Sequence, residues 1–144
     1  MEVCKFTVPG TPQGKGRPRV TKYGTFTPEK TKQYEELVRW SWRAAKCKPL
    51  ANQPLEVLVY AYFTPPKSAS KKKQNAMLGA PYMHKPDADN IAKAILDALN
   101  GIAYADDSAV VSLTVEKFYA ETARVDVVIR VLTEMDYDTD EVPE

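Results

Sequence analysis

The sequence has few of the residues that bind soft metals or build disulfide frameworks. Among its 144 residues there are two cysteines, Cys4 and Cys47, and one histidine, His84. Zinc sites take thiolate and imidazole ligands, so a metal bound by this chain would be a hard cation held by oxygen atoms. Two cysteines are also too few for the disulfide framework of a small secreted fold, which favours a cytoplasmic protein.

Long apolar segments are missing as well. No stretch approaches the ~20 apolar residues that a membrane-spanning helix needs. The N-terminal MEVCKFTVPG lacks the basic start and the apolar centre of a signal peptide. We therefore expect no membrane partner. The content of 44% hydrophobic and 27% charged residues is typical of a globular protein, and 144 residues suit a single domain.

The net charge of +1 conceals two halves of opposite sign. Residues 1–85 carry a balance of +11, and residues 86–144 carry −10. Six of the acids lie in residues 134–144, which we predict to be a flexible acidic tail that follows a folded domain of residues 1–133. A basic surface beside a group of carboxylates indicates an enzyme that acts on a polyanion. Charge segregation without a function is the alternative.

The pattern of apolar residues predicts an α+β fold with a mixed sheet and the order β, hairpin, α, β, α, β, β. Segments rich in β-branched and aromatic residues are the predicted strands: 3–8, 54–64, 109–120 and 123–133. The last two are expected to pair as a hairpin, and a smaller hairpin turns near Tyr23 and Gly24.

Two main helices are expected to pack on this sheet. The first is capped by Thr27, begins at Pro28 and runs to about Lys46. Trp40 lies outside its apolar face, so this side chain belongs either to a dimer interface or to the rim of the core. Residues 64–81 are expected to form a long basic loop.

The second helix lies in the segment HKPDADNIAKAILDALNGIAYADD, residues 84–107, which holds two close pairs of aspartates at its two ends. Asp87 is a favoured helix cap, and Gly101 ends the helix after Asn100. The chain then returns into a strand, and this return can bring Asp106 or Asp107 back beside the helix start.

Each of these acids also has an ordinary structural explanation. Asp87 and Asp89 can serve as acids in the first turn of a helix, where they favour its dipole. Lys93 and Asp97 are four residues apart and can form an exposed ion pair. The pair Asp106–Asp107 can belong to a turn.

Taken together, the acids fit the hydrolysis of a phosphodiester. A divalent cation neutralises the charge that develops on the phosphate and lowers the pKa of an attacking water. Mg²⁺ binds through a small number of carboxylates and keeps several waters. Lys93 follows Asp89 by one helical turn, so its ammonium can stabilise a charged transition state beside such an ion.

The motif KPDADNIAKAILDALNG (85–101), followed by YADDSAV (104–110), resembles the RusA-type Holliday-junction resolvases, a family common in phages and prophages. The upstream GKGRPRVTKYGTFTPEKTKQYE is similar to the N-terminal pattern of one branch of that family, so the resemblance spans about residues 3–133. It departs at Tyr104, where the family often has tryptophan, and at Ala109, where it often has glutamine.

The resemblance implies a homodimeric, Mg²⁺-dependent endonuclease that nicks four-way DNA junctions symmetrically during recombination and repair, with Mn²⁺ as a possible substitute. The family's metal-binding acids would fall on Asp87, Asp89 and Asp107, with Asp106 as an accessory ligand. The catalytic lysine would be Lys93, acting together with Asp87, Asp89 and Asp107.

Contacts with DNA are expected mainly from the basic half of the chain. The predicted contact residues are Lys15, Arg17, Arg19, Lys71, Lys72, Lys73, Lys85 and Asn90. The lysines of 71–73 can equally belong to a solvated loop. A structure-selective DNA endonuclease is the leading interpretation, and a non-catalytic DNA-binding module with a structural carboxylate cluster is the alternative. An RNA-binding protein is less favoured, because no aromatic stacking motif of the RNA-recognition type is visible.

Overall fold

The computed structural model describes residues 3–50 and 52–132, so the predicted acidic tail of residues 134–144 lies outside it. The elements are β1 (Val3–Pro9), β2 (Arg19–Thr21), β3 (Gly24–Phe26), α1 (Glu29–Ala44), β4 (Leu55–Phe63), α2 (Lys71–Met77), α3 (Ala88–Leu99), the 3-10 helix η1 (Asp107–Ala109), β5 (Val110–Tyr119) and β6 (Arg124–Val131). They form one α+β domain with a mixed sheet, which confirms the predicted class.

The main sheet has the strand order β1-β6-β4-β5. β4 runs parallel to β5 and antiparallel to β6, and β1 pairs with β6 antiparallel. The predicted hairpin of the last two strands is therefore wrong, although both strands lie where they were expected. β4 lies between them and pairs with both, and its alternating buried and half-buried residues show that one face packs on the core while the other is partly covered.

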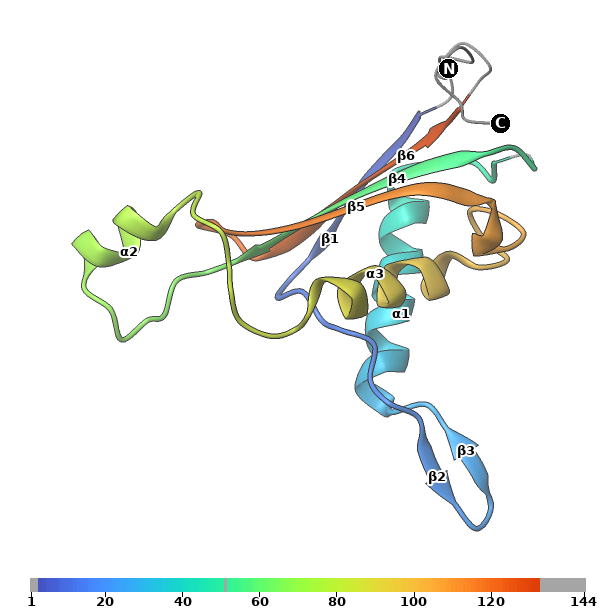
Figure 1. Cartoon of the computed structure of the whole chain (residues 1–144), viewed down its shortest axis with the longest axis horizontal. Helices are drawn as coiled ribbons and strands as arrows, with labels where there is room; N and C mark the ends of the chain where they lie inside the picture. The colour runs from blue at the N-terminus through green and yellow to red at the C-terminus, as the bar shows by residue number, and fades with distance from the viewer. Residues whose placement is uncertain (1–2, 51, 133–144) are drawn as a thin grey trace, which may run out of the picture.

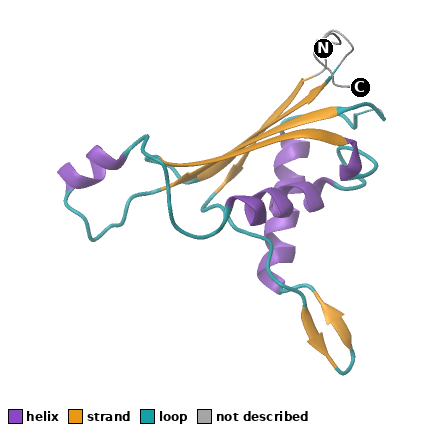
Figure 2. Cartoon of the chain, viewed as in Figure 1, coloured by secondary structure: helices purple, strands orange, loops and turns teal. Residues whose placement is uncertain are grey.

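Helices α1 and α3 cover one face of this sheet (Figures 1 and 2). Each helix turns one stripe toward the core, because buried residues recur every three or four positions. In α1 these are Thr31, Tyr34, Val38, Ser41 and Trp42, and in α3 they include Ile91, Ala94, Ile95, Ala98 and Leu99. Trp40 is 63% exposed on the outer side of α1, so it is not a rim residue of the core.

Two local predictions need correction. α1 begins at Glu29 with Pro28 in the N-cap position, and no side chain caps it, so Thr27 does not have the predicted role. The predicted loop of residues 64–81 contains the short helix α2, which begins where the hydroxyl of Ser70 accepts a hydrogen bond from the N–H of Lys73 (3.2 Å). A serine cap followed by three lysines, which are good helix formers, explains this helix.

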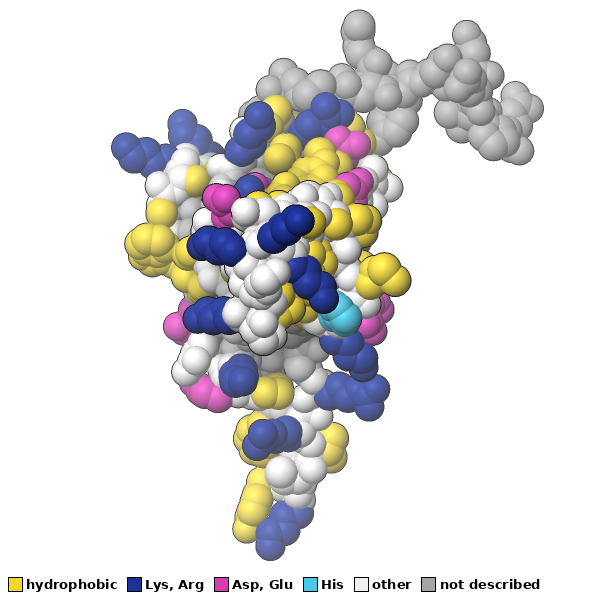
Figure 3. Space-filling view, turned by 90° about the vertical axis from the view of Figure 1, so that its left-hand side faces the viewer, with side chains coloured by type: hydrophobic (Ala, Val, Ile, Leu, Met, Phe, Trp, Pro, Cys, Tyr) yellow, Lys and Arg dark blue, Asp and Glu magenta, His cyan; other side chains and the backbone are white. Residues whose placement is uncertain are grey.

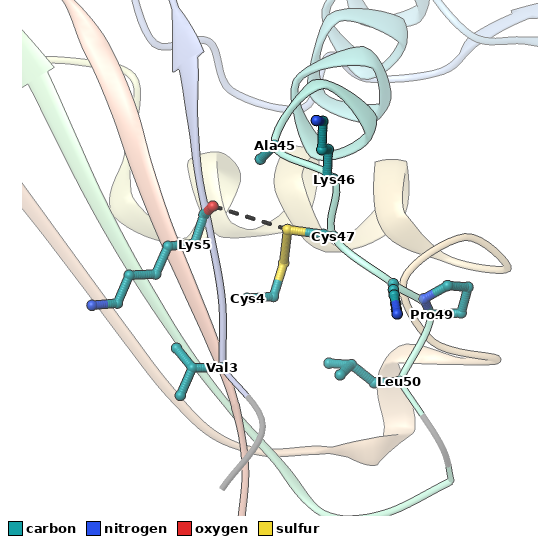
Figure 4. Close-up of a pocket in the computed structure, with 9 residues that line it drawn as sticks. Val3, Cys4, Lys5, Ala45, Lys46, Cys47, Pro49 and Leu50 are labelled. Atoms are coloured by element: carbon teal, nitrogen blue, oxygen red, sulfur yellow. Dashed lines mark hydrogen bonds between the residues drawn. A yellow bond between two sulfur atoms is a disulfide. The ribbon is translucent and has the colours of Figure 1, made fainter.

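A disulfide joins Cys4 of β1 to Cys47, just beyond α1, with their Cα atoms 5.7 Å apart. It lies in a pocket that also includes Val3, Lys5 and Leu50, and the sulfur of Cys47 is 3.9 Å from the carbonyl oxygen of Lys5 (Figure 4). A low cysteine count excluded a framework of bridges but did not reveal this single one. No helix within the described ranges has the length and apolar character to cross a membrane.

Candidate active site

The first pair of acids stands at the start of α3. Asp87 is the N-cap residue, with extended backbone angles of φ −67° and ψ 151°, and Asp89 lies in the first turn. The carboxylate of Asp87 makes no capping hydrogen bond, and both side chains are exposed. Helix capping therefore does not occupy the oxygens of Asp87, and they remain available to a ligand.

The loop that leads into Asp87 is anchored to the sheet by a lysine that the sequence interpretation missed. The ammonium of Lys117, on β5, donates hydrogen bonds to the carbonyl oxygens of His84 (2.8 Å) and Pro86 (3.0 Å). The same ammonium lies 5.6 Å from the ring centroid of Tyr82. In the sequence Lys117 is a charged residue at an otherwise apolar position of the alternation in β5, and the structure places it beside the buried Ala61. Lys117 thus fixes where the carboxylate pair begins.

The basic N-terminal loop passes directly beside this pair. The N–H of Lys15 donates to the carbonyl oxygen of Asn90 (3.0 Å). A Cβ added to Gly14 would lie 3.0 Å from the Cβ atoms of both Asn90 and Pro86, so only glycine allows so close an approach without movement. Arg17, two residues beyond Lys15 in the loop, is exposed.

Lys15 itself is engaged inside the protein. Its ammonium lies 2.7 Å from Oε1 of Glu35 and 3.3 Å from Oδ2 of Asp97, and Arg39 approaches Glu35 at 3.9 Å. Desolvation alone would lower the pKa of Lys15, but the hydrogen bonds and charges of Glu35 and Asp97 outweigh it and raise that pKa. Lys15 therefore ties the basic loop to α1 and α3, while Arg17 and Arg19 are exposed.

Lys93 lies on the exposed side of α3, one turn after Asp89. Within the part of the chain that the structure describes, it forms no salt bridge, and Asp97 pairs with Lys15 instead. The interpretation of Lys93 and Asp97 as an exposed ion pair therefore does not describe this protein. Its ammonium is free to meet a phosphate.

The second pair of acids lies at the opposite end of the helix, where η1 begins. The N–H of Asp107 donates to Oδ1 of Asn100, the residue that ends α3 (2.9 Å). A helix of 12 residues is ~18 Å long, so within one chain Asp107 is remote from Asp87. The expected return of Asp106 or Asp107 to the helix start does not occur within a single chain, because η1 and β5 begin beside the C-terminal end of α3.

The two distal acids have different surroundings. Oδ2 of Asp106 accepts a hydrogen bond from the N–H of Ser108 (3.1 Å) and caps η1, which lowers the pKa of Asp106. Tyr104 is buried against this region and donates its hydroxyl to the carbonyl oxygen of Leu96 (2.8 Å). Burial, and then the negative charge of Asp107, raise the pKa of Tyr104.

The chemistry of the donors fits a hard cation, but one chain does not assemble the full predicted set. Among residues 3–50 and 52–132, no three side chains of His, Cys, Asp or Glu lie close enough to hold one ion. Asp87 and Asp89 alone supply two carboxylates, a number that suits Mg²⁺ when waters complete its coordination.

The remaining predicted contact residues are all exposed. Lys71, Lys72 and Lys73 occupy the first turn of α2, and Lys85 and Asn90 flank Asp87 in sequence. Figure 3 shows Lys and Arg side chains spread over one face of the molecule, with fewer acidic side chains among them. This face of the molecule is therefore predominantly basic.

Comparison with known proteins identifies the family of the chain. The family described as "Endodeoxyribonuclease RusA" matches residues 9–130, a range that includes both pairs of acids and Lys93. The uncharacterized protein YqaN of Bacillus subtilis (strain 168) is 40% identical over 138 residues, which cover 90% of this chain and 97% of that protein. The match along most of the chain confirms the resemblance seen in its motifs, and the chain belongs to the RusA endodeoxyribonuclease family.

Proposed function

We propose that this protein is a Mg²⁺-dependent, structure-selective endonuclease that resolves four-way DNA junctions by paired symmetric nicks in recombination and repair. Membership of the RusA family supports a nuclease that acts on Holliday junctions. The observation that carries the proposal is the exposed Asp87–Asp89 pair at the start of α3, with Lys93 one helical turn away. The carboxylate of Asp87 makes no capping hydrogen bond, so both of its oxygens are available to a metal ion. We further propose that it acts in the cytoplasm, where the Cys4–Cys47 bridge would be kept reduced.

Each residue has a distinct task in this proposal. Asp87 and Asp89 would hold the ion, which supplies charge neutralisation and a more acidic water when it is bound. Mn²⁺ would be able to substitute for Mg²⁺. Lys93 places a positive charge where negative charge develops on the attacked phosphate. Lys117 acts on the site through the loop that it anchors.

The separation of the two acid pairs supports a homodimer. Two matched cuts on a two-fold symmetric junction call for two equivalent sites, which a C₂ dimer presents. Because ~18 Å of helix separates Asp107 from Asp87 in one chain, a second copy is needed if all three acids are to share an ion. In the proposed dimer, the Asp106–Asp107 pair of each copy completes the Asp87–Asp89 pair of the other.

Mixing two inactive variants tests this arrangement. Asp89→Asn and Asp107→Asn homodimers should each fail to cut. Mixed dimers would contain one site with both substitutions and one site with neither, so nicking of one strand should return on mixing. If the mixture stays inactive although exchange of subunits is demonstrated, the shared site is contradicted.

The alternative function is a DNA-binding module in which the acids have only structural roles. The test is incubation of the purified protein with an end-labelled four-way junction and with a matched linear duplex, in Mg²⁺ and in chelator. We expect paired nicks in the junction only, in Mg²⁺ only. Tight binding of the junction without cleavage in either Mg²⁺ or Mn²⁺ would favour the module.

A further inference from the structure

The β2–β3 hairpin projects from the body of the protein, away from the main sheet (Figures 1 and 2). All of its strand residues are exposed, and only Lys22 and Tyr23 connect the two strands at the tip. An isolated two-stranded hairpin is only marginally stable in water. A partner that packs against this one would therefore also order it.

Large apolar side chains are concentrated on this hairpin. Val20 is 81% exposed, Tyr23 at the tip is 80% exposed, and Phe26 is 49% exposed. Single exposed apolar residues are ordinary, but three on one small projecting hairpin, on both of its faces, indicate that the hairpin meets a partner.

The charge of the segment identifies the class of partner. No Asp or Glu occurs from Val3 to Pro28, whereas Arg17, Arg19 and Lys22 lie along or beside the hairpin. Basic and apolar side chains follow one another along the projection (Figure 3). The ammonium of Lys22 lies 5.2 Å from the ring centroid of Tyr23. An aromatic tip flanked by cations is complementary to a nucleic acid that exposes bases beside phosphates.

The position of the hairpin connects it to the candidate active site. Gly14 touches the start of α3 at Asn90 and Pro86, and Arg19 begins β2. Four residues separate Gly14 from Arg19, so the five steps between their Cα atoms span at most ~18 Å. DNA held at the Asp87–Asp89 pair would therefore come within reach of the hairpin.

We propose that the β2–β3 hairpin enters the open centre of branched DNA and that Tyr23 stacks on a base exposed there. This inference rests on the proposed function and adds a way in which the protein would distinguish branched DNA from a linear duplex. In a linear duplex each base is covered by its neighbours, so the ring finds no free base face. At a branch point stacking is interrupted, and stacking on an aromatic ring tolerates any base.

The test measures binding of the intact protein in chelator, where no strand is cut. The probes are a four-way junction with 2-aminopurine at its branch point and a linear duplex with the same base at its centre. Tyr23→Ala should bind the junction about tenfold more weakly, a loss within the range for base stacking. It should also lose the fluorescence change at the branch point, with its affinity for the duplex unaltered.

Two matched variants complete the design. Tyr23→Phe keeps the ring and should behave as the wild type. Val111→Ala removes another exposed apolar side chain, on β5, and should also bind the junction normally.

The outcomes separate this inference from the proposed function. If the wild type prefers the junction and Tyr23→Ala prefers it equally, the role of the hairpin is wrong while the nuclease proposal stands. Equal losses on junction and duplex, without a fluorescence effect, would place Tyr23 on a duplex arm and contradict entry at the branch point. A wild type with no preference for the junction contradicts both proposals.

Discussion

The side chain of Asn100 accepts a hydrogen bond of 2.9 Å from the backbone N–H of Asp107. This contact ties the distal acid pair to the end of α3, whereas Asp87 and Asp89 stand at its start. The two pairs bracket the helix instead of meeting at one point. A metal site that uses Asp89 and Asp107 together therefore requires a second copy of the chain.

Replacing Lys93 by alanine should separate catalysis from structure. Lys93 is exposed and forms no salt bridge among the described residues, so its loss should cost well under ~1 kcal/mol of folding free energy. A preorganised charge at the reacting phosphate is worth ~10²–10³ in rate. We expect Lys93→Ala to bind junctions normally and to cut them slower by that factor in single-turnover assays. Lys48→Ala, an exposed lysine beyond α1, is the control. A K93A protein that cuts at the normal rate would remove Lys93 from the mechanism.

The lysines of α2 should contribute to the salt dependence of binding. Each phosphate contact contributes about −0.9 to the slope of log affinity against log salt concentration. Replacing Lys71, Lys72 and Lys73 with glutamine should make the slope shallower by up to ~2.7 if all three contact phosphates. Titration of a fluorescent junction at several salt concentrations measures this slope. The same slope in the variant and the wild type would show that the lysines of α2 do not contact phosphates.

The Cys4–Cys47 bridge should stabilise the folded protein. It links residues 43 apart in sequence, and bridges that close loops of this size typically contribute ~2–4 kcal/mol. Cys47→Ser should lower the free energy of unfolding by this amount in denaturant titrations without reductant. Reductant should lower the stability of the wild type equally and leave the variant unchanged. A wild type that is insensitive to reductant would show that the bridge adds nothing.

Alkaline pH should destabilise the protein through Tyr34. Burial raises the pKa of Tyr34 to about 12, and a contact with the backbone of Gln13 offsets only part of this rise. The hydroxyl meets no partner with hydrogen-bond geometry among the described residues. The folded state thus keeps a proton that the unfolded chain loses near pH 10, so stability falls as the pH rises from about 10 to 12.

Urea titrations at pH 9, 10 and 11 measure this effect. Tyr34→Phe keeps the buried ring but cannot ionise, so its stability should fall less steeply over this range. Parallel pH profiles for the variant and the wild type would contradict the role of Tyr34.

The sequence predicted elements well wherever the local pattern decides the structure. The alternation from Leu55 to Phe63 and the apolar spacing from Ile91 to Leu99 gave a strand and a helix in the right places. Pairing was harder to predict. The apolar pattern shows that a strand is buried but does not identify the strands that pair with it. The position of β4 between β5 and β6 was therefore not predicted.

For the candidate active site, too, the local features were predictable from the sequence and the long-range contacts were not. The start of α3 with Asp87, Asp89 and Lys93 follows from capping and helical spacing, which are local. The tie between Lys15 and Asp97 and the anchoring of the His84–Pro86 loop by Lys117 join residues far apart in the chain. Those contacts arise from tertiary packing, and a single sequence does not report them.

The rate at which Asp89→Asn cuts a four-way junction in Mg²⁺ tests the central claim most directly. The substitution removes a charge but preserves the shape of an exposed side chain, so the fold and the affinity for DNA should persist. Glu116→Gln makes the corresponding change on an exposed acid of β5 and should cut normally. We predict that Asp89→Asn cuts slower by orders of magnitude while binding the junction as the wild type does. Cutting at the wild-type rate would show that the catalytic carboxylates are not those at the start of α3.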